Sequence, residues 1–309
     1  MEFGKLHSID HVNWTLPPDD EDSMDFLKQL PQKKSGETQF YIGTPAWGHK
    51  EWIGKIYPFK TQPKDFLRFY SQVFNTIELN TTHYQIPSKE KAQEWLGQVS
   101  ENFLFCPKLF QGISHSPNGL LDKNLLKDWF YFLENLKSHL GPVFAQFPPH
   151  FDYSRKAQLF KFLETWPKDF ELSLELRHPS WFQNNHVLAA LRNYLQTKGV
   201  GLVILDVAGR RDLVHTSVSA PFVQLRLIGN SLHPSDIQRV QDWSIKFEKW
   251  SSLGLKKVFF FAHQPDDILA PEFSREVVKI LNHDCHANLQ SIPDISQIEP
   301  TQKSFLCFH

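Results

Sequence analysis

The segment SLELRHPSW, residues 173–181, places an acid and a base on one side of a predicted buried strand. Leu174 and Leu176 alternate with Glu175 and Arg177, and successive side chains of a strand point to opposite faces. One face is therefore apolar, while the other carries a carboxylate and a guanidinium. Since a lone buried charge is costly, the ionic face is expected to lie over water or over a site.

The same division into an apolar and a polar face recurs in other strand-like segments. Their polar side chains include Glu78, Asn80, Lys108, Gln146, Asp206, Gln224, Arg226, His263 and Gln264. Two glutamates from different strands, Glu78 and Glu175, can act as acid and base if their surroundings split their pKa values. Guanidinium groups suit phosphate and carboxylate, so Lys108, Arg177 and Arg226 favour a site that binds an anion.

Histidines and aromatic residues near the strand ends add further candidates. His178 follows the fifth strand, where a catalytic role and a packed, hydrogen-bonding role are both open. His115 is a weaker candidate. Trp47, Trp181 and Tyr84 lie just after strands, where an aromatic ring can stack on a sugar or base or can instead belong to the core.

Eight strand-like segments alternate with helical patterns along the chain. The strands are predicted at 40–47, 76–84, 103–110, 142–149, 170–179, 200–209, 222–230 and 257–264. Helical periodicity is found at 63–74, 88–99, 123–141, 154–166, 184–198, 235–253 and 272–282. This α/β alternation predicts a parallel eight-stranded (β/α)8 TIM barrel, with the helix missing or short between strands 6 and 7. A doubly wound sheet is less favoured because no GxGxxG turn follows the first strand.

A barrel would gather functional side chains at the C-terminal ends of its strands. The predicted catalytic residues are Glu78, Glu175, His178 and Asp206, and the predicted substrate-binding residues are Asn80, Lys108, His115, Gln146, Arg177, Arg226, Trp47, Trp181 and Tyr84. We expect a hydrolase or lyase that acts on a small anionic substrate, such as one bearing phosphate. A purely structural lattice of ion pairs, a glycoside hydrolase, and a protein that binds a ligand or single-stranded nucleic acid without catalysis remain alternatives.

Composition and charge narrow the partners and the compartment. The 309-residue chain has a net charge of −1, so no global basic field favours nucleic acid. No apolar run reaches the length of a membrane span, and the N-terminus lacks a signal-peptide pattern. Three scattered cysteines do not suggest a disulfide scaffold, so a cytoplasmic protein is expected. The sequence does not define an oligomeric state.

The two ends of the chain differ in composition from its middle. Residues 1–38 are predicted to be a polar extension with at most one short helix near 23–30, residues 39–282 the barrel domain, and residues 283–309 a C-terminal tail. The tail contains HDCH at 283–286 and CFH at 307–309, but these spacings match no zinc template. No cofactor is predicted; a divalent metal is left open as an alternative but is not indicated.

Five motifs together resemble the YecE-like family, also called domain of unknown function 72. They are IGTPAWGHKEWIGKIYP (42–58), FYSQVFNTIELNTTHYQIPS (69–88), FLFCPKLFQGISH (103–115), GPVFAQFPPHF (141–151) and ELRHPSWF (175–182). The resemblance covers about 39–282 and implies a TIM-barrel fold, but no established activity. The polar positions that recur in the family fall on Glu78, Asn80, Lys108, His115, Gln146, Glu175, Arg177, His178, Asp206 and Arg226. The chain departs from the family pattern at 205–207, at 228 and at 262–264.

Overall fold

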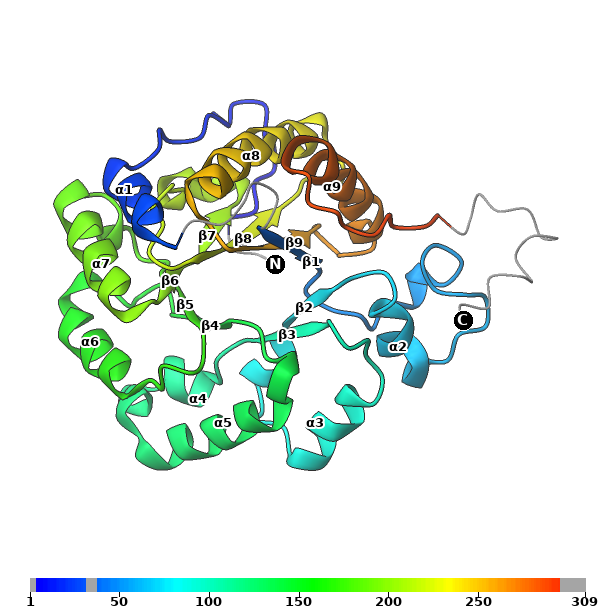
Figure 1. The fold of residues 1–309 in the computed structure, drawn as a ribbon, viewed down its shortest axis with the longest axis horizontal. Helices are drawn as coiled ribbons and strands as arrows, with labels where there is room; N and C mark the ends of the chain where they lie inside the picture. Colours follow the sequence, from blue (N-terminus) through cyan, green and yellow to red (C-terminus); the bar gives the residue numbers. More distant parts are fainter. Residues whose placement is uncertain (1–3, 32–37, 295–309) are drawn as a thin grey trace.

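The computed structural model describes residues 4–31 and 38–294, in which strands and helices alternate (Figure 1). The strands are β1 Gln39–Gly43, β2 Thr76–Leu79, β3 Leu104–Pro107, β4 Val143–Gln146, β5 Leu172–Glu175, β6 Gly201–Leu202, β7 Ile204–Asp206, β8 Phe222–Ile228 and β9 Lys257–His263. The helices are α1 Glu21–Gln29, α2 Phe66–Tyr70, α3 Lys89–Leu96, α4 Gln111–Ser114, α5 Lys123–Leu136, α6 Lys156–Thr165, α7 Asn185–Lys198, α8 Pro234–Leu253 and α9 Ala270–Cys285. Each predicted strand and each predicted helix therefore has a counterpart.

Every pair of strands in the described chain runs parallel, and the strands form three sheets. The orders are β1-β9-β8-β7, β4-β5-β6 and β2-β3. The strands lie around a common centre and the helices lie outside them (Figure 1). The predicted parallel α/β architecture is confirmed, whereas the single ladder of eight strands is divided into shorter sheets.

The predicted sixth strand is interrupted at Val203. The short strand β6 pairs with β5, and β7 pairs with β8. Between them, Val203 N donates to Leu174 O at 2.8 Å, while Val203 O accepts from His215 Nε2 at 3.1 Å. The segment from β7 to β8 contains only a 3-10 helix, Ala208–Leu213, so the expected absence of an α-helix there is confirmed.

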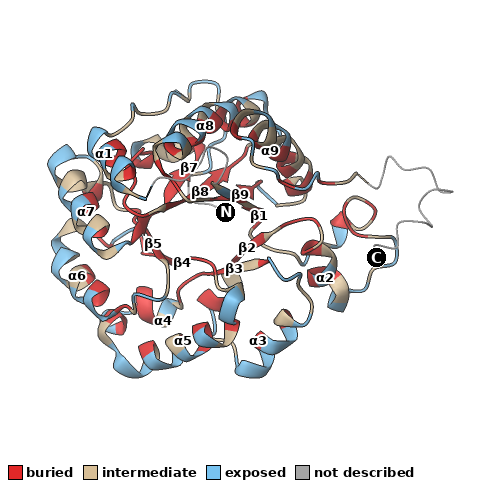
Figure 2. Ribbon diagram, in the orientation of Figure 1, coloured by how far each residue is buried: buried red, intermediate tan, exposed pale blue. Residues whose placement is uncertain are grey.

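Buried side chains lie mainly on the strands and on the helix faces turned toward them (Figure 2). Helix α5 illustrates how one helix face becomes buried: its fully buried residues Trp129, Leu133 and Leu136 recur at helical spacing and so lie on one side. Asp122 caps this helix by accepting hydrogen bonds from the backbone N–H groups of Asn124 and Leu125. Local capping and one apolar stripe thus fix α5 against the strands.

The end of β1 requires a glycine for close approach to β2. A Cβ atom on Gly43 would lie 2.3 Å from Thr76 O, closer than a side chain allows. Just beyond, Glu78 N donates to Thr44 O at 3.2 Å. The missing side chain of Gly43 therefore permits the backbone of β2 to come next to that of β1.

The segment before β1 packs against the helices α7 and α8. Arg192 of α7 is 2% exposed and contacts the carboxylates of Asp20 and Asp22 at the start of α1. Asp19 accepts from Lys246 Nζ of α8 at 2.9 Å. The predicted short helix is present as α1, and the proposed domain boundaries at 38 and 282 remain predictions.

Two sequence predictions lie partly or wholly outside the described residues. Cys307 and His309 belong to the tail segment that is not described, whereas Cys106 and Cys285 are buried free thiols.

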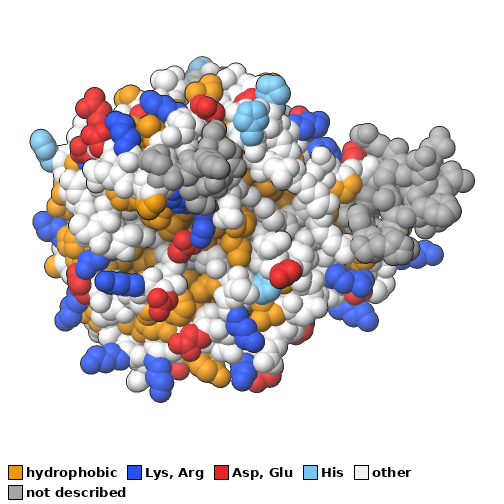
Figure 3. Space-filling view, viewed as in Figure 1, with side chains coloured by type: hydrophobic (Ala, Val, Ile, Leu, Met, Phe, Trp, Pro, Cys, Tyr) orange, Lys and Arg blue, Asp and Glu red, His pale blue; other side chains and the backbone are white. Residues whose placement is uncertain are grey.

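No helix in 4–31 or 38–294 is both long and apolar enough to cross a bilayer. On the face drawn in Figure 3, acidic and basic side chains are interspersed.

Candidate functional site

Arg226 of β8 contacts two glutamates that come from two other strands, far apart in the sequence. Its Nε and Nη2 donate to Glu78 of β2 at 2.7 and 2.9 Å, and its Nη1 donates to Glu175 of β5 at 2.6 Å. Arg226 and Glu78 have no exposed area, and Glu175 is 1% exposed. The predicted convergence of these three side chains is therefore present, in the form of a buried ion-pair cluster.

Three further side chains complete the hydrogen bonding of the two carboxylates. Arg177 Nε donates to Glu175 Oε1 at 2.5 Å. Asn80 Nδ2 donates to Glu78 Oε1 at 2.8 Å, and His263 Nε2 lies 3.0 Å from Glu78 Oε2. Since an ionised carboxylate only accepts, the His263 Nε2–H is the donor.

Both glutamates are held in the ionised form. Burial alone would raise the pKa of Glu78, but the charges of Arg226 and His263 outweigh it and hold that pKa well below its usual range. Burial likewise opposes the charges of Arg177, Arg226 and Lys108 at Glu175, whose pKa is also lowered. The pKa values of both carboxyl groups are therefore lowered, rather than one being raised to make a proton donor. Neither carboxyl group is a ready proton donor at neutral pH.

Lys108 lies directly after β3, beside this cluster. Its backbone is fixed by a hydrogen bond from Lys108 N to Leu79 O at 3.2 Å and by one from Thr82 Oγ1 to Lys108 O at 2.7 Å. Burial, together with the nearby charge of Arg226, lowers the pKa of Lys108 to about 8. Its ammonium is 6.0 Å from the centre of the Phe144 ring, which Arg226 also faces at 5.5 Å.

A cavity of about 330 Å³ lies above the cluster. It is lined by Pro45, Asn80, Tyr84, Lys108, Gln146, Arg177, Ile228, His263, Gln264 and Asp267. Five predicted substrate-binding residues are thus brought together: Asn80, Tyr84, Lys108, Gln146 and Arg177. Glu78, Glu175 and Arg226 are absent from this lining and are buried.

Three larger hollows among the described residues hold none of the predicted site residues. One, of about 540 Å³, lies between residues 4–10 and the loops that follow β7 and β8. A second, of about 680 Å³, lies between α5 and α6, and a third, of about 380 Å³, lies between the end of α5 and the start of β9. The cavity at the strand ends is the one that gathers predicted site residues.

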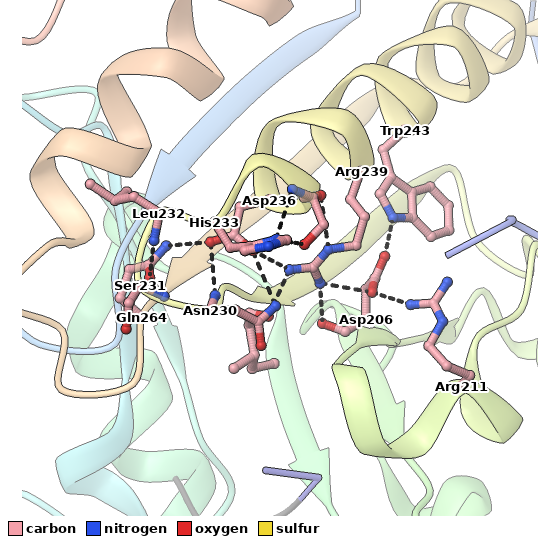
Figure 4. A network of polar contacts seen from close by, with 12 residues as sticks. Asp206, Arg211, Asn230, Ser231, Leu232, His233, Asp236, Arg239, Trp243 and Gln264 are labelled. Atoms are coloured by element: carbon pink, nitrogen blue, oxygen red, sulfur yellow. Dashed lines mark hydrogen bonds and ion pairs between the residues drawn. The ribbon is translucent and has the colours of Figure 1, made fainter. Parts of the chain in front are cut away.

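Asp206 is not part of the cavity. It faces α8, where it accepts from Arg239 Nη1 at 3.0 Å and from Trp243 Nε1 at 2.8 Å, and it also pairs with Arg211 (Figure 4). Arg239 in turn donates to Asp236 at 2.8 Å. The expectation that Asp206 joins the two glutamates is thus not met, because its side of β7 is turned toward the helix layer.

The remaining predicted residues lie away from the cavity lining. His178 Nδ1 bonds to Ser180 at 2.8 Å and caps a 3-10 helix, and His115 lies against the ring of His83 at 4.9 Å. Burial lowers the pKa of His115 to about 4, so its ring is neutral at pH 7.

Of the three predicted aromatic residues, Tyr84 lines the cavity, whereas Trp181 and Trp47 pack against other aromatic side chains. Trp181 is fully buried and donates from Nε1 to Phe151 O at 2.7 Å. Trp47 packs edge-on against Trp95. Tyr84 is 70% exposed at the cavity.

His263 and Gln264 are cavity residues that the prediction of site residues did not include. Both lie at the end of β9, and the period-two alternation that places His263 beside Glu78 was available in the sequence. Gln264 Oε1 accepts from Ser231 N at 2.9 Å, which fixes the amide beside the network of Asp236 (Figure 4).

Within the described segments, His, Cys, Asp and Glu side chains do not form a group of three that could hold a metal ion. The polar groups that line the cavity include three amides and two cations, which suit an anionic ligand, together with His263 and Asp267.

Comparison with known families identifies the chain's relatives. Residues 41–297 match the model of the family described as "Protein of unknown function DUF72". The chain is 29% identical over 282 residues to UPF0759 protein YecE of Escherichia coli K12, covering 85% of this chain and 98% of that protein. It is 30% identical over 149 residues to UPF0759 protein YunF of Bacillus subtilis, covering 46% of this chain and 52% of YunF.

Solved structures of DUF72 proteins share the fold. One from Enterococcus faecalis V583 aligns with a TM-score of 0.66 at 20% identity, over 84% of this chain and 99% of that chain. Another, from Thermotoga maritima MSB8, aligns with a TM-score of 0.59 at 22% identity, over 79% and 98% of the two chains. The fold, the motifs and the matched length agree, and the chain belongs to the DUF72 family.

Proposed function

We propose that this protein is an enzyme of the hydrolase or lyase class whose substrate is a small anion held in the cavity above Glu78 and Glu175. The observation that carries this proposal is the charge balance of the cluster. Three cations, Lys108, Arg177 and Arg226, face two ionised glutamates. These five groups carry one positive charge in excess, and two of the three cations line the cavity, beside the carboxylate of Asp267.

The anion is expected to bind to Lys108 and Arg177, with amide groups orienting the rest of the substrate. Asn80 and Gln146 line the same cavity. The Oε1 atom of Gln146 is buried and has no hydrogen-bond partner within the described chain, so a hydroxyl or N–H of the substrate can donate to it.

His263 is the group best placed to transfer a proton. Its Nε2 is oriented by Glu78 at 3.0 Å, and its ring lines the cavity. A histidine held by a carboxylate has a fixed tautomer and a stabilised imidazolium form. We therefore assign acid–base chemistry to His263, with Glu78 as its positioning residue.

We also propose that the three sheets are arcs of one eight-stranded barrel. Backbone hydrogen bonds between the arcs support this: Glu78 N donates to Thr44 O, and Leu109 N donates to Phe144 O at 3.0 Å. The strands β6 and β7 would count as one strand interrupted at Val203. The cavity would then lie at the C-terminal end of the barrel, where enzymes of that fold carry their sites.

The alternatives receive less support. Glycoside hydrolysis requires one protonated carboxyl, but the pKa values of Glu78 and Glu175 are both lowered. Stacking of single-stranded nucleic acid requires exposed rings. Trp181 is inside the core, which leaves Tyr84 as the exposed ring at the cavity among the predicted aromatic residues.

Binding of inorganic phosphate, measured by calorimetry at pH 7, tests the anion site. Lys108→Met should weaken binding by about 10-fold or more, since hydrogen bonds to charged groups contribute about 1.5–3 kcal/mol. Lys257→Met is the matched control, because Lys257 is paired with Glu171 at 2.9 Å at the other end of β9. Equal affinities in the wild type and Lys108→Met, or no binding by the wild type, would contradict the anion site.

Screening small phosphate esters and organic acids for turnover tests the enzymatic part. Any activity found should be lost in His263→Gln while phosphate binding persists, since His263 is assigned to proton transfer and not to the anion. Turnover that survives this substitution would remove His263 from the mechanism.

A further inference from the structure

Lys108 differs from the other cations of the cluster in having no carboxylate partner. Arg226 and Arg177 each contact a glutamate at 2.7 Å or less. Among the described residues, Lys108 Nζ forms no hydrogen bond or ion pair, and the residue is 9% exposed. The amine is thus largely buried, opens toward the cavity, and lies 6.0 Å from the centre of the Phe144 ring.

Its surroundings disfavour the ammonium form. Burial removes water from the amine, and the positive charge of the Arg226 guanidinium lies nearby, over the same Phe144 ring. Desolvation and a neighbouring cation are the two conditions that convert a lysine into a nucleophile near neutral pH. Glu175 and Glu78 act in the opposite sense, but their charges are shared with Arg226 and Arg177.

We propose that Lys108 is a nucleophile that forms an imine with a substrate carbonyl, and that the substrate is a small aldehyde, ketone or 2-oxo acid carrying a carboxylate or phosphate. This inference rests on the anion site proposed above and narrows its chemistry from hydrolase or lyase to lyase. The anionic group would bind near Arg177, and the carbonyl carbon would face Lys108 Nζ.

The step conserves atoms and charge. The neutral amine of Lys108 attacks the carbonyl carbon, and the C=O π electrons move to oxygen. One proton passes from nitrogen to that oxygen, giving a carbinolamine. A second proton, delivered through His263, allows the hydroxyl to leave as water, and the nitrogen lone pair forms the C=N⁺ bond. Overall, one protonated lysine and one carbonyl give one iminium and one water.

The pKa of about 8 agrees with this role, since a substantial fraction of the amine is then neutral at physiological pH. The iminium would accept electrons from a bond at the adjacent carbon, which is the chemistry of carbon–carbon cleavage or of elimination. Gln146 Oε1, which has no partner in the described segments, can accept from the carbinolamine hydroxyl.

Competitive labelling with acetic anhydride across pH 6–11 measures the reactivity of each lysine by peptide mass spectrometry. Lys108 should show a midpoint near pH 8. Exposed lysines should follow the ordinary value of about 10.4. A Lys108 midpoint at the ordinary value would overturn the inference.

Borohydride reduction in the presence of pyruvate, and separately of dihydroxyacetone phosphate, tests imine formation directly. At least one probe should give a covalent adduct on Lys108, which Lys108→Arg should lose and Lys257→Arg should keep. Urea unfolding of Lys108→Arg checks that the loss is not caused by unfolding. If neither probe gives an adduct on Lys108, the inference is rejected.

The two proposals fail in different ways. Phosphate binding that depends on Lys108, without adducts and with an ordinary labelling midpoint, would leave the anion site standing and remove the imine. Adducts on Lys108 in a protein that does not bind phosphate would keep the imine and remove the anion site.

Discussion

Arg226 and Glu78 form a two-pronged ion pair, with Nε and Nη2 at 2.7 and 2.9 Å from the two carboxylate oxygens, and neither side chain has exposed area. The remaining Nη1 of the same guanidinium reaches Glu175. A single rigid fork thus fixes β2, β5 and β8 relative to one another beneath the cavity.

Arg226→Lys should lower the free energy of unfolding by about 3–5 kcal/mol. The lysine ammonium is a point charge and cannot serve both carboxylates of the cluster, so one is left buried without its partner. Urea unfolding measures the change. Arg68→Lys is the control, because Arg68 is exposed and 3.6 Å from Asp65, and it should change stability by less than about 0.5 kcal/mol. Equal stability of both variants would contradict the bridging role.

Asp206→Asn should separate stability from ligand binding. The substitution removes the charge opposite Arg239 and Arg211 and should lower the free energy of unfolding by about 3 kcal/mol. Phosphate affinity, measured by calorimetry on the folded variant, should stay within about 2-fold, since Asp206 is not part of the cavity lining. A large loss of affinity with unchanged stability would instead restore the catalytic role predicted from the sequence.

The buried His215 should make stability depend on pH. Its Nε2 donates to Val203 O, and its Nδ1 accepts from Ser217 N at 3.2 Å, so the neutral ring is required. Burial lowers the pKa of His215 to about 4. In the unfolded chain, a histidine has a pKa of about 6.5. The unfolded state therefore binds more protons between these values, and stability is complete above pH 6.5 and falls toward pH 4, by about 3 kcal/mol.

Urea midpoints between pH 4 and 7 test this dependence. The variant His215→Gln should show a shallower slope than the wild type, and His186→Gln, at an exposed position, should keep the wild-type slope. Identical slopes in the wild type and His215→Gln would exclude His215 as the source.

Gly43→Ala should destabilise the protein by about 1–3 kcal/mol, because the new methyl group would overlap Thr76 O and separate β1 from β2. Gly48→Ala provides a control in the same loop region, since nothing lies within 4 Å of its Cβ position. Thermal unfolding of the two variants should differ by several degrees. A Gly43→Ala protein as stable as Gly48→Ala would show that β2 can shift without cost.

The alternation of side chains was sufficient to predict that Glu78, Glu175 and Arg226 converge. The prediction made them catalytic or substrate-binding residues, whereas they lie buried and outside the cavity lining. Glu78, Glu175 and Arg226 each stand opposite apolar neighbours in their strands, so period two and parallel pairing place them on one side. The same reasoning failed for Asp206. Its partners Arg239 and Trp243 come from α8, more than thirty residues later, and the interruption at Val203 is not visible in the sequence.

The roles of single side chains were harder to predict than their positions. Trp181 follows a strand as a ligand-stacking ring would, yet it stacks on Phe151 inside the core. His263 lies in a segment that departs from the family pattern, and its contact with Glu78 depends on the place of β9 beside β1 and β8 in the fold. Propensity and periodicity specify elements, whereas tertiary contacts decide which polar side chains meet.

The contacts of Arg192 bear on where the folding unit begins. In the part of the chain that is described, its carboxylate partners are Asp20 and Asp22, both N-terminal to the first strand. A chain truncated just before residue 38 would leave this guanidinium enclosed without a counter-ion. The minimal stable fragment should therefore start ahead of Asp19, even though the matched family region starts at residue 41.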